Sequence, residues 1–123
     1  VLNLFVVDLL PDGTALGAQD LAKLRAKIWE ITDVLVLLPP YSTFSRQRHK
    51  SHWGPAPARD SAWPRGMPAL HDSQRQAVQN ENDITDYCCA LLADLRKRPV
   101  IVMWLAPGDL GRGARGTPAS IWR

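Results

Sequence analysis

The sequence predicts an α/β fold with a mostly parallel, doubly wound sheet. Three short apolar runs, at residues 1–7, 33–38 and 100–106, have the composition of strands buried on both faces. Segments with helical periodicity lie between them, at residues 18–31 and 71–98. Strands that alternate with helices are typical of parallel sheets joined by right-handed crossovers. The 123 residues, of which 46% are hydrophobic, are expected to form one domain.

The first half of the chain holds two of these strands and one helix. The first run, VLNLFVV, ends at Asp8. Within residues 18–31 the leucines and isoleucines recur every three or four positions, which places them on one face of an amphipathic helix. The second run ends at Pro39 and Pro40, because proline has no amide hydrogen to donate within a sheet.

The second half begins with a long connection and ends with a helix and a strand. Residues 41–70 are rich in proline, arginine and tryptophan and lack periodicity; loops of this length are usually functional or disordered. Ser73 and Gln76 have the spacing of a capping box at the start of the following helix. Its expected buried face consists of Ala77, Ile84, Cys88, Leu91 and Leu95.

Basic residues concentrate in one part of the long loop. Between residues 45 and 66 there are five basic residues and one acid, in a chain whose net charge is only +3. Such a concentration is typical of a surface that binds phosphate groups, although a solvated basic loop is the alternative. The residues predicted to contact nucleic acid are Arg46, Arg48, His49, Lys50, Arg59 and Arg65.

The remaining composition favours an intracellular protein, nuclear or cytoplasmic, without a membrane segment. No apolar run is long enough to cross a bilayer, and the N-terminus has no signal-peptide pattern. Cys88 and Cys89 are adjacent, which disfavours a loop-closing disulfide between them and suits a reducing compartment. The cysteines and histidines lack the paired spacing of metal ligands, so no metal site is predicted.

Ligands of a parallel sheet bind beyond the carboxyl ends of its strands. Three such ends can be named in this chain: Asp8, Tyr41 with the two prolines before it, and residues 106–109. We expect them to open on the same edge. There Asp8 can accept hydrogen bonds from a ribose, or it can simply be a turn residue.

Several motifs follow one another around and after these strand ends. They are LPPYSTFSR at 38–46, Arg48-His49, Gly54-Pro55, WPRGMP at 63–68, Asn80 or Asn82, PGDLG at 107–111 and PASIW at 118–122. Together they resemble a group of cytosine DNA methyltransferase-like proteins, whose pattern runs Ser-Pro-Pro-Cys-Ser-Thr-Phe-Ser-Arg, a Pro/Gly/Arg loop, Glu-His-Pro-Glu-Asp-Leu-Gly and Pro-Ala-Ser-Ile-Trp. The resemblance covers most of residues 34–122. It implies a Rossmann-like methyltransferase sheet, DNA as partner and S-adenosylmethionine as cofactor.

The resemblance also implies that the catalytic positions are degenerate. Methylating carbon 5 of cytosine requires a thiolate that adds to carbon 6 and an acid that hydrogen-bonds the ring nitrogen. Tyr41 stands at the cysteine position, with Ser45 in the same motif, and Leu105 stands at the glutamate position. A phenol with a pKa near ~10 does not replace a thiolate, and leucine has no proton to donate. We therefore expect the chain to be inactive.

The cofactor-binding part is incomplete as well. Methyltransferases of this fold carry a glycine-rich turn after their first strand, and this sequence has none. Its first strand best matches a later strand of the family, so the sheet is expected to be truncated on its N-terminal side. Asp8, Pro39 and Pro40 are the remaining candidates for contacts with S-adenosylmethionine.

Other functions remain open. Residues 33–41 also have the spacing of the Asn/Asp-Pro-Pro-Tyr motif of amino-methylating enzymes, in which the aromatic ring stacks on a flipped base, but Leu38 stands at the acceptor position. Alternatively, the chain is a nucleic-acid-binding module that keeps the basic loop and uses Tyr41 as a stacking platform. A relic that merely folds is the third possibility.

Overall fold

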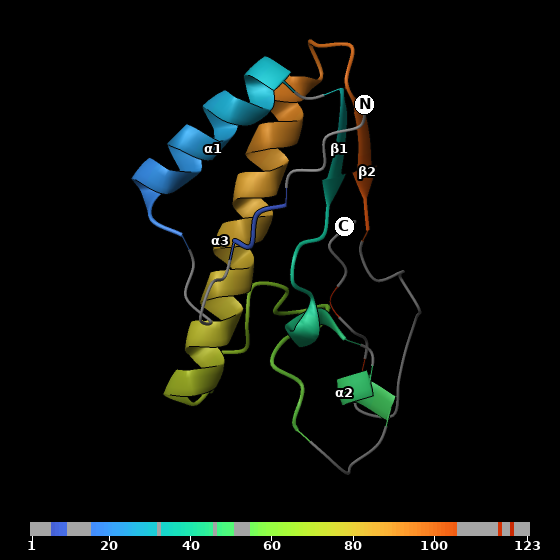
Figure 1. The fold of residues 1–123 in the computed structure, drawn as a ribbon. Coiled ribbons are helices and arrows are strands. Elements are labelled where there is room, and N and C mark those ends of the chain that lie inside the picture. Colours follow the sequence, from blue (N-terminus) through green and yellow to red (C-terminus); the bar gives the residue numbers. More distant parts are fainter. Residues whose placement is uncertain are drawn as a thin grey trace.

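The computed structural model describes residues 6–9, 16–31, 33–45, 47–50, 55–105, 116 and 119. Two long helices lie together on one side of a small sheet, and the loop region lies beyond the strand ends (Figure 1). The elements in chain order are α1 (Ala18–Ile31), β1 (Val34–Leu37), the 3-10 helix η2 (Ser42–Phe44), α2 (Gln47–Lys50), α3 (Asp72–Leu95) and β2 (Ile101–Trp104).

The sheet consists of β1 and β2, which pair in parallel. Val34 lies opposite Ile101, and Leu37 lies opposite Trp104. Because α3 lies between the two strands in the chain, β1, α3 and β2 form the strand–helix–strand unit that the sequence predicts. The mixed α/β character and the parallel pairing are confirmed, and α1 has the predicted bounds.

The core lies between the sheet and the two long helices. Ile28 of α1 and four residues of α3 pack against Leu37 of β1; the four are Ile84, Cys88, Leu91 and Leu95. These α3 residues recur at three- and four-residue steps, which places them on one face of the helix. Burial of each aliphatic side chain contributes about 1.5–3 kcal/mol, so this face holds α3 to the sheet.

The strands differ from the prediction in one respect, because only one face of the sheet is buried. Exposed and covered residues alternate along both strands. On the uncovered face, Val34, Val36, Ile101 and Met103 are between 46% and 64% exposed. Apolar composition on both sides of a strand suggested two covered faces, but in the described residues helices pack on one side only.

Two further predictions about single elements need correction, and a third falls mostly outside the described residues. The first predicted strand lies mostly outside the described residues, and its last two residues, Val6 and Val7, are exposed and not in a strand. Helix α3 begins at Asp72, so Ser73 lies inside it and does not form the capping box; the N-cap His71 makes no side-chain cap. The long loop contains η2 and α2, so it is not without regular structure.

None of the helices in the described part combines the length and the apolar character that a membrane crossing requires.

Candidate nucleic-acid interface at the strand ends

The carboxyl ends of β1 and β2 open on the same edge of the sheet. The Leu105 amide donates a hydrogen bond to the Leu37 carbonyl at 3.0 Å, which extends the ladder one residue beyond β2. Tyr41 follows β1 closely and is the N-cap of η2, where its carbonyl accepts a 3.0 Å bond from the Phe44 amide. The Tyr41 side chain is 52% exposed. The edge therefore presents an aromatic ring to solvent.

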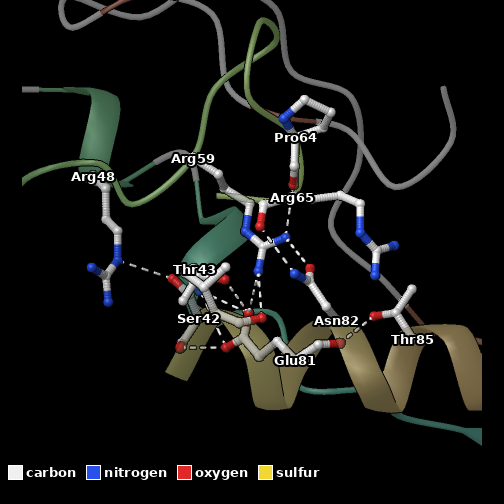
Figure 2. Close-up of polar contacts among 10 residues, drawn as sticks. Ser42, Thr43, Arg48, Arg59, Pro64, Arg65, Glu81, Asn82 and Thr85 are labelled. Atoms are coloured by element: carbon white, nitrogen blue, oxygen red, sulfur yellow. Dashed lines mark hydrogen bonds and ion pairs between the residues drawn. The ribbon is translucent and has the colours of Figure 1, made fainter. Parts of the chain in front are cut away.

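A buried carboxylate on α3 holds η2 in place. Glu81 is 4% exposed and accepts a 2.6 Å hydrogen bond from the Ser42 hydroxyl. The Thr43 amide donates to the same carboxylate at 3.1 Å, and the Thr43 hydroxyl also donates to it. Three donors from two consecutive residues thus converge on one side chain, and they fix the backbone next to Tyr41 (Figure 2).

We call residues 55–70 the distal loop, and the buried Arg59 joins it to the same part of α3. Arg59 is fully buried, and its Nη1 donates to the Asn82 Oδ1 at 2.9 Å and to the Pro64 carbonyl at 2.8 Å. The Asn82 amide nitrogen in turn donates to the Arg65 carbonyl at 3.0 Å. Figure 2 shows Glu81 and Asn82 rising from one turn of α3 toward the loop. We call Ser42, Thr43, Arg59, Glu81 and Asn82 the clamp.

The charges within the clamp partly compensate each other. The Arg59 Nη2 lies 3.8 Å from the Glu81 carboxylate, and the Arg59 guanidinium lies 3.8 Å from the centre of the Phe44 ring. Burial lowers the pKa of Arg59 to about 10, and the Glu81 charge opposes this shift. A cation with an ion pair, a ring contact and several carbonyl partners tolerates burial, whereas an isolated one does not.

Of the clamp residues on α3, Asn82 belongs to the motif series of the sequence, whereas Glu81 is not singled out there, although a signal is present. Along the buried face of α3, the positions between Val78 and Cys88 include three polar residues: Glu81, Asn82 and Thr85. Polar side chains at positions that periodicity assigns to the core require buried partners. This interruption of the stripe indicates a buried polar contact, but the sequence does not identify η2 and Arg59 as the partners.

Two of the residues predicted to bind nucleic acid are buried, and their predicted role requires correction. Arg59 belongs to the clamp, and His49 is 0% exposed. Both ring nitrogens of His49 lack a hydrogen-bond partner among the described residues. Neither side chain is accessible to a large ligand in this arrangement; the Arg59 guanidinium is held against α3 by its bonds to Asn82 and to the Val78 carbonyl.

The other basic residues differ in how far their charge is compensated. Arg65 forms a two-pronged ion pair with Asp86, at 2.7 and 3.0 Å, and this hydrogen bonding lowers the pKa of the Asp86 carboxyl. Arg48 is partly exposed; its Nε donates to the Ser42 carbonyl at 3.1 Å, and no carboxylate in the described ranges pairs with it. Arg46 and the Lys50 side chain lie outside the description. Arg48 therefore supplies a cation close to Tyr41.

The remaining predicted site residues are those assigned to catalysis and those assigned to the cofactor. Leu105 is 50% exposed, and Ser45 is half-buried in the backbone that follows η2. Pro39 is buried and Pro40 half-buried, whereas Asp8 lies in an exposed segment without regular structure. Burial of Pro39 withdraws it from a ligand, whereas the contacts of Asp8 and Pro40 with S-adenosylmethionine stay predictions.

A small cavity lies between η2 and the first turns of α3. It measures about 140 Å³ and is lined by Thr43, Arg48, Ala58, Ser73, Gln74 and Ala77. Pockets for cofactor-sized ligands usually enclose about 300–1,000 Å³, so this cavity is too small for S-adenosylmethionine. In the described ranges no three histidine, cysteine or acidic side chains gather as a metal site.

Comparison of the chain with models of protein families, with curated proteins and with solved structures finds no match.

Proposed function

We propose that this chain is a methyltransferase-like α/β domain that no longer transfers methyl groups and binds nucleic acid through Tyr41 at the strand ends. The observation that carries the proposal is the exposed Tyr41 ring beside a backbone fixed by hydrogen bonds to the buried Glu81 carboxylate. An aromatic ring on a rigid backbone loses little conformational entropy when a base stacks on it. The charge of Arg48 supports attraction of a phosphate to the same edge.

The chemistry of the two catalytic positions supports binding without catalysis. Tyr41 offers a phenol where the resemblance requires a thiolate, and Leu105 offers a hydrocarbon where it requires an acid. Tyr41 does not supply the thiolate that adds to carbon 6, and Leu105 has no proton with which to hydrogen-bond the ring nitrogen. Stacking requires only the face of the Tyr41 ring, which every base can meet.

The amino-methylating alternative receives no support from the strand ends. Its acceptor position is occupied by Leu38, which is 70% exposed and has no side-chain oxygen. A target amino group would therefore not be held there. Base stacking on Tyr41 is the part of that mechanism which this chain retains.

The test is a fluorescence-anisotropy titration of a labelled single-stranded oligonucleotide with the chain and with Tyr41→Ala. We expect Tyr41→Ala to weaken binding about 5- to 150-fold, because stacking on an aromatic side chain contributes about 1–3 kcal/mol per base. Trp29→Ala is the matched control, since Trp29 is a comparably exposed aromatic residue, at 41%, on α1. Equal affinities for the chain and for Tyr41→Ala would refute the proposal.

A further inference from the structure

The uncovered face of the sheet is continuous and apolar. The outward-facing residues of β1 are Val34 and Val36, those of β2 are Ile101 and Met103, and the alternation continues to Leu38 and Leu105. The strand register places Val34 beside Ile101 and Val36 beside Met103. We call these six residues the open face. All six are between 46% and 70% exposed, and none carries a polar group.

Such a face is unusual for a parallel sheet exposed to water. Parallel strands occur almost only in sheets with both faces covered, because their side chains are apolar on both sides. In this chain the other face is covered by α1 and α3. Contiguous exposed apolar patches of a few hundred Å² on soluble proteins usually mark an interaction site.

We propose that the open face packs against the same face of a second copy of this chain. The absence of charge means that the partner surface must also be apolar, and the same chain supplies a surface of this chemistry with the same strand spacing. Two such sheets packed about a two-fold axis place identical patches against each other, as in most homodimers. Sheets that pack face to face lie about 10 Å apart, with their side chains between them.

The area of the open face is sufficient for a weak dimer. At exposures of 46–70%, six aliphatic side chains present on the order of 500 Å². Two copies would therefore bury on the order of 1,000 Å², which is near the lower limit for a specific interface. A dissociation constant in the micromolar range is expected. The proposal does not depend on nucleic-acid binding, because it rests on the sheet face and not on Tyr41.

The test is sedimentation equilibrium of the chain from about 1 to about 100 µM, the range in which a micromolar dimer dissociates. We expect the mass of two chains at the upper end. Val36→Lys, at the centre of the open face, should raise the dissociation constant at least about 100-fold, because each copy would bury an unpaired ammonium group. Val6→Lys is the matched control: Val6 is an exposed valine, at 77%, outside the sheet, and this variant should still dimerise.

A mixing experiment distinguishes self-association from loss of folding. Val36→Lys and Val36→Glu should each be monomeric, while an equimolar mixture should form a heterodimer, because opposite charges then meet in the interface. Circular dichroism of each variant checks that it is folded. A monomeric wild-type chain at 100 µM, or a dimer that Val36→Lys does not weaken, would overturn the proposal.

Discussion

Among the arginine–carboxylate ion pairs of the described residues, the Arg59–Glu81 and Arg65–Asp86 pairs differ clearly in burial. The Arg59–Glu81 pair is buried within the clamp, whereas both partners of the Arg65–Asp86 pair are more than half exposed. Water and salt screen the exposed pair, and its contribution to stability is small. Removing one partner of a buried pair leaves an uncompensated charge, which is costly.

Glu81→Gln should therefore reduce the free energy of unfolding by about 3 kcal/mol, while Asp86→Asn should reduce it by less than about 1 kcal/mol. The first substitution keeps the shape of the side chain but leaves the buried Arg59 without its counter-charge. Urea denaturation of the two variants, followed by circular dichroism, measures both values. Similar losses for the two variants would mean that the clamp is not a stabilising unit.

The residues of the clamp illustrate what the sequence could and could not reveal. Arg59 was predicted to face nucleic acid, because a basic residue in a proline-rich loop is usually solvated. Its burial depends on Glu81 and Asn82, which lie more than 20 positions along the chain. Local patterns do not specify contacts over such separations, so the packing of the loop that contains Arg59 on α3 could not be predicted.

At the scale of elements, apolar periodicity predicted the positions of the helices better than the capping motif predicted where a helix begins. The leucines and isoleucines of α1 and the apolar stripe of α3 located both helices, because packing against the sheet decides their position. The capping box was misleading, since Ser73 and Gln76 have the right spacing but α3 begins one residue earlier. Ala77 was assigned to the buried face and is exposed, whereas its neighbour Val78 is buried.

The distal loop packs against α3 at a glycine that the structure requires. Gly66 has φ = +120°, and a Cβ placed on it would lie 2.8 Å from the Val78 side chain. Gly66→Ala should cost about 1–3 kcal/mol of stability through backbone strain and overpacking. Gly17→Ala is the control, because its Cβ would meet nothing closer than 3.6 Å.

Thermal unfolding of the two glycine variants measures the difference. We expect Gly66→Ala to lower the melting temperature by several degrees, and we expect Gly17→Ala to stay close to the wild type. An unchanged melting temperature for Gly66→Ala would show that the loop does not pack closely on α3 in solution.

At the scale of the whole molecule, the buried Cys88 and the half-buried Tyr87 should make stability depend on alkaline pH. Burial raises the pKa of the Cys88 thiol to about 11 and also raises the pKa of the Tyr87 phenol. Both groups hold their protons more tightly in the folded chain than in the unfolded chain. Their contribution is therefore present below the unfolded pKa values, about 8.5 for cysteine and 10 for tyrosine, and is lost as pH rises through the folded ones.

The free energy of unfolding should accordingly fall between about pH 9 and pH 10, and the slope should be shallower for Cys88→Ala. Measurements should stop near pH 10, because lysine and exposed tyrosine side chains also begin to titrate there. Urea midpoints at each pH provide the slopes. Identical slopes for wild type and Cys88→Ala would contradict the burial of this thiol.

The sequence was sufficient to predict the unit of β1, α3 and β2. It was not sufficient to predict that one face of the sheet is exposed. Apolar runs such as VLVL in β1 indicate that both faces of a strand avoid water, but not what covers the second face. The same limit applies to function, since the motifs around Tyr41 suggest an ancestry and not a present activity.

The central claim is that the clamp positions Tyr41 for nucleic-acid binding, and a double-mutant cycle of oligonucleotide affinity tests it most directly. Thr43→Val keeps the side-chain shape and removes a hydrogen bond to Glu81, and Thr43, at 2% exposure, cannot touch the ligand itself. We expect Thr43→Val to weaken binding in the wild type but not in the Tyr41→Ala background, which gives a coupling of about 1 kcal/mol. Equal losses in the two backgrounds would contradict the claim, because the clamp would then act on affinity without Tyr41.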